Sequence, residues 1–307
     1  MSIPPWARPD ADVQLSQAQV RALVTRQHPD LAELELGPAI EGWDTVVHRL
    51  GPHLAVRIPR HAGAAAHAGA EHQWLPRLAP AWGFAVPAPV RMGAPSDELP
   101  WAWSVARWIE GVPAYESPLN AKGAGDLGRA LAQVHQPAPP DAPRNPFRSI
   151  TLAARAERFD LRMEHLIEAG VPIDADAARA EFLAGAGLRR GPETWCHLDL
   201  HGANVLTHGG RLAGILDWGD LAAGDPATDL GQAWCLVGSS RFRDVLHGYR
   251  HGAVALDEAA MLRARAEALG YAVTLAAVED EPYADAGRRA LVDLGVLARG
   301  ARASARS

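Results

Sequence analysis

The sequence predicts an α+β chain with two lobes, a small antiparallel-sheet N-lobe and a larger, mainly helical C-lobe. Up to about residue 109, short apolar stretches alternate with glycine and proline, which is typical of strands and turns. Beyond Gly111, apolar residues recur at helical spacing over longer stretches. A length of 307 residues with 48% hydrophobic content is sufficient for two cores. We therefore expect lobes at 1–109 and 110–299.

The N-terminal lobe is expected to begin with a helix within residues 15–28, which starts near Ser16 and is followed by Pro29. Residues 32–60 then read as a strand and a hairpin, cut by glycine and proline. At the end of this hairpin, "LAVRIPR" alternates apolar and polar residues, which places Arg57 on the face opposite Leu54, Val56 and Ile58.

An alanine-rich helix that carries Glu71 is expected next, ending near Pro76 or Pro80, followed by two more strands before Gly111. In the C-terminal lobe, residues 124–136 and material within 151–188 have the amphipathic spacing of helices. A small hairpin interrupts them within 195–217. Further helices are expected at 227–250, 257–278 and 284–299, and the basic tail 300–307 is expected to be disordered.

The composition argues against several classes of protein. A formal net charge of −6 and an isoelectric point near 6.1 do not fit a nucleic-acid binder. Cys196 and Cys235 cannot build a disulfide framework and lie in no CxxC pair, which suits a reducing compartment. No secretory signal and no apolar run of about 20 residues is evident. We expect a cytoplasmic protein without a nucleic-acid or membrane partner.

The strongest chemical signal is His197-x-Asp199-x-x-x-x-Asn204, followed after a short hairpin by Asp217. Phosphoryl transfer needs a carboxylate beside the attacking hydroxyl and oxygen ligands that hold Mg²⁺ on the phosphates. Asp199 would orient and deprotonate the hydroxyl, Asn204 and Asp217 would ligate the metal ion, and His197 would brace the loop. Alternatively, each Asp and Asn is only a turn or cap residue, as most isolated ones are.

Three segments, "HLDLHGANVL", "GILDWGD" and "GDPATDLGQAW", resemble the aminoglycoside phosphotransferase family of antibiotic kinases. The segments "EGWDTVVHRLG", "LAVRIPR", "AEHQWLP" and "WSVARWIEG" resemble it more loosely, so that the resemblance covers most of residues 40–235. It implies a bilobal, protein-kinase-like fold, ATP or GTP as phosphoryl donor, and Mg²⁺ as cofactor. It also implies that Asp199 is the catalytic aspartate and Asp217 the metal aspartate.

The nucleotide site that the resemblance implies departs from the family in two places. Arg57 stands where the family usually has lysine, with Glu71 as its expected ion-pair partner. The expected nucleotide loop has one glycine, Gly42, which could equally serve an ordinary turn. The hinge whose backbone meets the adenine would be Arg107, Trp108 and Ile109, although this segment could be a plain strand end.

The acceptor is expected to be a small molecule with a hydroxyl group, most simply an antibiotic such as an aminoglycoside or a macrolide. Trp218 and Asp220 are the candidate acceptor contacts, because they directly follow Asp217. An aminoglycoside would need carboxylates, which Asp220 and the acidic residues of "VEDEP" (Glu279, Asp280 and Glu281) could supply. A nucleoside or peptide antibiotic fits equally well, as does an acceptor of a metabolic sugar or amino-alcohol kinase.

Two further classes remain open from the sequence alone. His197, Asp199 and His201 alternate along the chain and could present ligands to Zn²⁺ in a metal-dependent hydrolase, although such sites usually need additional ligands. Because Arg57 replaces the usual lysine, a nucleotide-binding protein without activity is also conceivable; the intact set Asp199, Asn204 and Asp217 argues against it.

Overall fold

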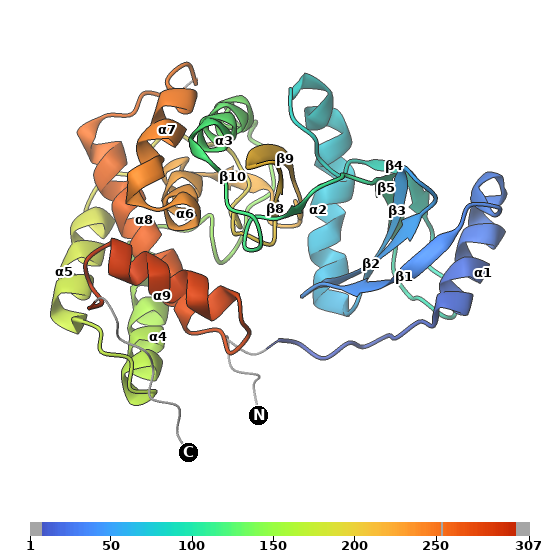
Figure 1. Cartoon of the computed structure of the whole chain (residues 1–307), viewed down its shortest axis with the longest axis horizontal. Coiled ribbons are helices and arrows are strands. Elements are labelled where there is room, and N and C mark those ends of the chain that lie inside the picture. Colours follow the sequence, from blue (N-terminus) through green and yellow to red (C-terminus); the bar gives the residue numbers. More distant parts are fainter. Residues whose placement is uncertain (1–7, 253, 299–307) are drawn as a thin grey trace. The chain divides into compact units, whose positions relative to one another are not determined.

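A computed structural model describes residues 8–252 and 254–298 (Figure 1). The chain forms two compact units, one of Arg8–Glu110 with Gly214–Asp220 and one of Gly111–Ala213 with the chain from Leu221 onward. Residues 214–220, which the sequence analysis placed in the C-terminal lobe, therefore belong to the first unit. Residue 299 and the tail at 300–307 lie outside the described residues.

The first unit is built on a five-stranded sheet in the order β1-β2-β3-β5-β4, and every neighbouring pair of strands is antiparallel. The predicted antiparallel sheet is thus confirmed. The strands are β1 Leu36–Glu41, β2 Thr45–Leu50, β3 Leu54–Pro59, β4 Pro89–Gly93 and β5 Trp103–Arg107.

Two helices accompany this sheet, α1 (Gln17–Gln27) and α2 (Ala62–Leu78), and lie on its two sides in Figure 1. The short 3₁₀ turns η1 (Pro29–Leu31) and η2 (Ala79–Ala81) follow them. Ser16 caps α1 by a capping box with Gln19. Apolar residues of α1 share one core with Val56 and Ile58 of β3, so the predicted alternation along β3 is confirmed.

The segment 214–220 joins the first unit through its backbone and through one indole ring. The amide of Ile215 donates to the carbonyl of Ala85 over 3.0 Å. The ring of Trp218 stacks on Trp82, with centroids 4.7 Å apart, and lies 6.3 Å from the ring of Phe84. These contacts cannot be read from the sequence, because the partners lie 130 or more residues apart along the chain.

The second unit is mainly helical, as predicted. Its helices are α3 Ala121–Val134, η3 Ala153–Arg155, α4 Ala156–Glu168, α5 Ala175–Ala186, α6 Ala227–Val237, α7 Ser239–Tyr249, α8 Glu258–Ala276 and α9 Tyr283–Asp293. Its strands are β6 Val112–Pro113, β7 Thr194–Cys196, β8 Val205–His208, β9 Arg211–Ile215 and β10 Ala222–Gly224, of which β9 continues into the first unit. The hairpin expected within 195–217 is β8–β9.

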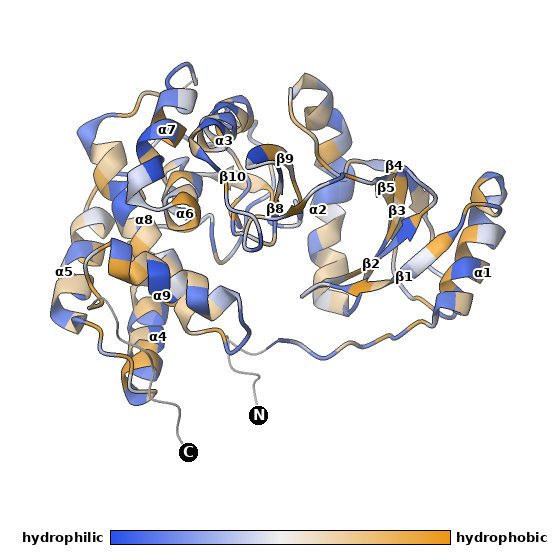
Figure 2. Ribbon diagram, viewed as in Figure 1, coloured by the Kyte–Doolittle hydropathy of each residue, from blue (hydrophilic) through white to orange (hydrophobic). Residues whose placement is uncertain are grey.

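The prediction of a continuous helix at 227–250 is wrong, because the chain forms two helices there. Gly238 separates α6 from α7 and has φ 75°, a left-handed conformation that ends a helix. The last helix also ends earlier than expected, at Asp293. Polar and apolar bands alternate along α7 in Figure 2, which is typical of a helix with one buried face.

The core of the second unit gathers around α8. Its apolar residues pack with those of α4, α5 and α9, including Phe159 stacked on Phe182 with centroids 4.3 Å apart. Elsewhere α3 and α7 approach closely at Gly128, where a Cβ atom would come within 2.0 Å of the carbonyl of Val245. Within the part of the chain that the structure describes, no helix combines the length and the apolar character needed to cross a bilayer.

Candidate active site

The loop that carries the sequence motif, residues 197–204, lies between β7 and β8 and is anchored by Asp229 of α6. The Asp229 carboxylate accepts hydrogen bonds from the amides of His197 and Leu198, each over 2.7 Å. It also lies 3.0 Å from Nε2 of His135. Leu198 has φ 69°, an uncommon conformation for a residue with a branched side chain. The anchor therefore fixes a strained backbone directly before Asp199.

The charge of Asp229 itself is stabilised by its neighbours. Complete burial would raise the pKa of this carboxyl, but the hydrogen bond from His135 and the charges of His135 and His197 hold it below its usual value. His197 is also fully buried, and its Nδ1 accepts from the amide of Asp199 over 3.2 Å. This is the geometry that a loop-bracing residue needs.

The carboxylate of Asp199 is surrounded by hydrogen-bond donors. Arg148 forms a short ion pair with Oδ1, and the hydroxyl of Tyr271 donates to the same oxygen over 2.9 Å. Nε2 of His201 lies 3.6 Å from Oδ2. Burial alone would raise the pKa of Asp199, but the charges of Arg148 and His201 hold it well below its usual range. The side chain is therefore an ionised carboxylate at neutral pH.

Asn204 lies in the same loop and is 7% exposed. Its Nδ2 donates to the backbone carbonyl of Asp199 over 2.9 Å and lies 3.1 Å from Nε2 of His201. Its Oδ1 makes no hydrogen bond with the described part of the chain. The amide is thus held by its nitrogen, and its oxygen is left as a possible metal ligand.

An aromatic cluster borders the loop on its His201 side. The rings of Tyr115 and His201 are nearly parallel, with centroids 6.1 Å apart, and Tyr283 meets His201 edge-on at 5.1 Å. Gly202 allows this packing, because a Cβ atom there would lie 2.1 Å from the ring of Tyr115. The rings of Tyr115, His201 and Tyr283 thus form an aromatic cluster beside the loop that carries Asn204.

In the first unit, Arg57, Glu71 and Asp217 form a second polar group. Arg57 makes a two-pronged ion pair with Glu71, as the sequence predicted, and the two side chains are 13% and 3% exposed. Burial would lower the pKa of Arg57, but Glu71 and, at longer range, Asp217 raise it. Asp217 has φ 55°, and its Oδ1 accepts from the amide of Gly219 over 3.4 Å. A cation and a strained carboxylate thus lie within electrostatic range of one another.

Two of the expected nucleotide contacts are corrected by the structure. The amide of Gly42 donates to the carbonyl of Thr45 over 2.8 Å, so it closes the β1–β2 turn and is not free to bind phosphate. The amide of Trp108 donates to the carbonyl of His53, also over 2.8 Å, and its ring lies under Arg49. The hinge remains a prediction only for Arg107, which is exposed, and for the half-buried Ile109.

The expected acceptor contact of Trp218 is also corrected. Its side chain is 0% exposed, stacked on Trp82, and its Nε1 donates to the carbonyl of Ile215 over 2.9 Å. This ring has no exposed surface and packs against Trp82 and Phe84, so it cannot touch an acceptor. Asp220 is half-buried and remains a candidate.

The hydrolase alternative finds no support in the geometry. His197 is completely buried and uses Nδ1 within its own loop. Among residues 8–252 and 254–298, the one group of three potential metal ligands is His135, Cys196 and Asp229, not the expected set. That group is buried, and burial raises the pKa of the Cys196 thiol, which disfavours the thiolate that zinc requires. We interpret it as the internal anchor of the loop at residues 197–204.

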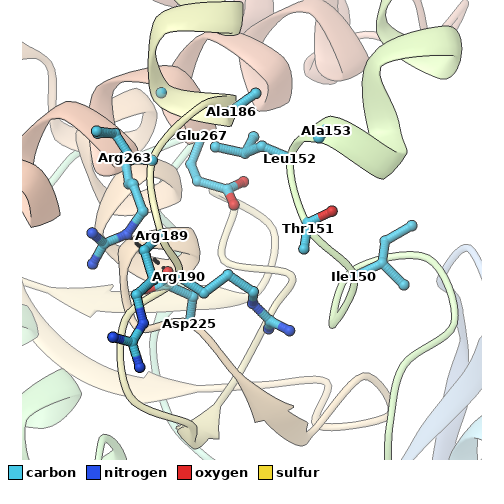
Figure 3. Close-up of a pocket in the computed structure, with 12 residues that line it drawn as sticks. Ile150, Thr151, Leu152, Ala153, Ala186, Arg189, Arg190, Asp225, Arg263 and Glu267 are labelled. Atoms are coloured by element: carbon cyan, nitrogen blue, oxygen red, sulfur yellow. Dashed lines mark hydrogen bonds and ion pairs between the residues drawn. The ribbon is translucent and has the colours of Figure 1, made fainter.

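A cavity of about 250 Å³ lies elsewhere in the second unit, beside α5 and α8 (Figure 3). Its two carboxylates are already paired, since Asp225 binds Arg263 over 2.9 Å and Glu267 binds Arg155. Asp225 also accepts from the amide of Gly191. The carboxylates therefore serve the fold, and the cavity does not offer free acidic groups to a cationic ligand.

Sequence analysis missed the residues that hold Asp199. Arg148 lies in "NPFRSI" and Tyr271 in the middle of α8, and neither segment has a motif that distinguishes it. Asp229 was visible as part of "GDPATDLGQAW", but its spacing gave no role. All three act through contacts across 30 or more residues.

A buried, strained loop that presents an ionised aspartate and an asparagine oxygen has the donor set of a phosphoryl-transfer enzyme. The sequence profile of the phosphotransferase enzyme family matches residues 35–268. The chain belongs to this family and is an enzyme of the kinase type.

Individual proteins are similar to this chain in sequence or in fold. Viomycin phosphotransferase of Streptomyces vinaceus is 28% identical over 206 residues, which are 59% of this chain and 67% of that protein. The fold is similar to the GDP complex of aminoglycoside 2'-phosphotransferase-IIIa, with a TM-score of 0.64, 19% identity, and coverage of 91% and 98% of the two chains. The fold is also similar to that of a macrolide 2'-phosphotransferase from Brachybacterium faecium. The TM-score is 0.57, the sequence identity is 22%, and the match covers 89% of this chain and 97% of that chain.

Proposed function

We propose that this enzyme transfers the γ-phosphoryl group of ATP or GTP to a hydroxyl of a small molecule, and that the acceptor is an antibiotic. The observation that carries the proposal is the ionised carboxylate of Asp199, held by three donors in a family of phosphotransferases. Cytoplasm, where nucleoside triphosphates are available, remains the expected location.

The chemistry follows from the state of Asp199. The acceptor hydroxyl donates a hydrogen bond to the carboxylate, which directs the oxygen at the γ-phosphorus. The new O–P bond forms as the bond between the γ-phosphorus and its bridging oxygen breaks, and the nucleoside diphosphate leaves with that electron pair. The hydroxyl proton passes to Asp199. Because its pKa is low, Asp199 is a weak base, and orientation is its main contribution in a loose transition state.

The residues fit a magnesium ion by their chemistry. Asn204 Oδ1 and the Asp217 carboxylate are hard oxygen donors, which Mg²⁺ prefers, and no thiol or imidazole is needed. A magnesium ion bound here with the nucleotide would neutralise part of the negative charge of the phosphates. Arg57, held by Glu71, would supply a second positive charge for the phosphates.

Arg57→Ala is expected to raise the KM for the nucleotide and to slow transfer, because a buried positive charge for the phosphates is lost. Arg57→Lys should recover part of the loss, since lysine restores the charge without the planar fork that binds Glu71. Steady-state kinetics with varied ATP and GTP measure both effects. If both variants match the wild type, Arg57 only serves packing of the first unit.

Arg148→Gln is expected to move the acid limb of the kcat/KM profile to higher pH. Arg148 depresses the pKa of Asp199, so its removal raises that pKa, and the ionised carboxylate is then lost at a higher pH on acidification. Rate profiles from about pH 4 to 9 test this: the wild type should show no acid limb from Asp199 in this range, and the variant should show one. An unchanged acid limb with an unchanged rate would show that Arg148 does not set the charge of Asp199.

The acceptor class rests on the relatives, which act on viomycin, aminoglycosides and macrolides according to their names. Of the carboxylates that an aminoglycoside would need, Glu281 is paired with Arg288, whereas Glu279 and Asp280 are exposed. ATP and GTP consumption in the presence of single antibiotics tests the proposal. Acceptor-dependent consumption that requires Mg²⁺ supports it, and consumption that no added acceptor stimulates contradicts it.

A further inference from the structure

Four arginines lie on the segment that leads into α4 and on its first turns: Arg148, Arg155, Arg158 and Arg162. Two of them are neutralised by acids. Arg148 pairs with Asp199, and Arg155 pairs with Glu267 of α8. The segment thus contacts the Asp199 carboxylate directly through Arg148 and carries two more positive charges, Arg158 and Arg162, on the first turns of α4.

Arg158 and Arg162 have no carboxylate partner among residues 8–252 and 254–298. The guanidinium of Arg158 lies 4.8 Å from the centre of the Phe147 ring, and Arg162 donates weakly to the carbonyl of Arg158 over 3.4 Å. Asp160, which lies between the two arginines along the helix, is engaged by Arg179 over 2.8 Å. Both residues are half-buried.

These arginines also repel one another. Burial and the charges of Arg158 and Arg148 lower the pKa of Arg162 to about 10. Burial and the charges of Arg148 and Arg155 lower the pKa of Arg158 as well. Both remain protonated at neutral pH, so three mutually interacting cations, Arg148, Arg158 and Arg162, gather on the segment whose Arg148 pairs with Asp199.

The contacts that Arg158 and Arg162 make within the described part of the chain, a ring and a backbone carbonyl, include no anion. Arg158 lies in the first turn of α4, where the helix dipole disfavours a cation, and unpaired partly buried charges cost free energy. Arginine presents a planar fork of donors that fits carboxylate or phosphate oxygens. An anion bound between these side chains would relieve both the repulsion and the missing hydrogen bonds.

We propose that the acceptor carries an anionic group, a carboxylate or a phosphate, that Arg158 and Arg162 bind while the acceptor hydroxyl meets Asp199. This inference rests on the proposed phosphotransferase function and specifies its substrate class. It predicts discrimination against polycationic aminoglycosides, because their charge is repelled by the same arginines.

Binding of inorganic sulfate tests the site without any transfer. Calorimetric titration is carried out with saturating Mg²⁺ and ADP, so that sulfate does not report on the nucleotide phosphates. The double variant Arg158→Gln/Arg162→Gln should bind sulfate about tenfold or more weakly than the wild type. Arg243→Gln removes one exposed cation of α7 and should leave the affinity unchanged. Equal affinity in the double variant and the wild type overturns the proposal and assigns the sulfate to another site.

Transfer assays test the substrate class. Hydroxy acids are compared with their amides, and sugar phosphates with the unphosphorylated sugars, so that the two arms distinguish carboxylate from phosphate. The wild type should prefer the anionic member of one pair by about tenfold or more in kcat/KM, and the double variant should lose this preference. Kanamycin and neutral acceptors serve as the comparison.

The outcomes separate this inference from the proposed function. Preference for kanamycin or for the neutral members, unaffected by the double variant, overturns the inference and leaves the phosphotransferase function intact. No Asp199-dependent transfer to any class contradicts the proposed function itself. The sulfate titration then still decides whether Arg158 and Arg162 bind an anion, because it needs no transfer.

Discussion

Asp199→Ala is expected to lower kcat by about 100-fold or more, because the variant loses the group that orients the hydroxyl and accepts its proton. The fold should persist, since Asp229 and not Asp199 anchors the loop backbone. Removal of the carboxylate breaks the ion pair between Asp199 and Arg148, which adds a local cost but no new steric conflict. Initial rates on the best acceptor, together with thermal unfolding, measure both effects.

A matched control removes an aspartate that has no part in the site. Asp141→Ala changes an exposed loop residue of the same unit and should keep the wild-type rate. If Asp199→Ala retains most of its transfer rate while remaining folded, another residue is the catalytic aspartate, and the assignment of the loop is wrong.

Asp217→Asn is expected to weaken Mg²⁺-nucleotide binding and to reduce turnover by about 100-fold. The amide has nearly the shape of the carboxylate but no charge, so the left-handed backbone at residue 217 can persist while the metal loses an anionic ligand. Raising the Mg²⁺ concentration should recover part of the rate. Nucleotide titrations at several Mg²⁺ concentrations separate binding from turnover.

His201→Ala serves as the counterpart that distinguishes a kinase from a metal hydrolase. His201 contacts Asp199 and Asn204 through Nε2, so its loss should reduce the rate modestly and leave the Mg²⁺ dependence as it is. A stoichiometric zinc in the wild type that disappears in this variant would reverse the preference for a kinase.

Much of the fold could be predicted because local patterns carry it. The alternation along β3 placed Arg57 opposite the core residues, whereas its ion pair with Glu71 was expected from the resemblance to the phosphotransferase family. Ser16 and Pro29 gave both ends of α1. The motif around Asp199 was visible because its residues lie within eight positions of one another.

What could not be predicted depends on contacts between distant segments. Trp218 was assigned to the acceptor from its position beside Asp217, but its partners, Trp82 and Phe84, come from a loop more than 130 residues earlier. The amide of Gly42 could have bound phosphate, and only the geometry of the turn shows that Thr45 occupies it. Arg148 and Tyr271 reach Asp199 from segments without any motif.

The most direct test of the account follows a radiolabelled γ-phosphoryl group from ATP or GTP into the acceptor. The account predicts that label appears as a phosphate ester on an acceptor hydroxyl, that transfer requires Mg²⁺, and that Asp199→Ala nearly abolishes it. Label released only as inorganic phosphate, or an equal yield of ester from Asp199→Ala, would contradict the claim that this enzyme phosphorylates a small molecule with Asp199 as its catalytic residue.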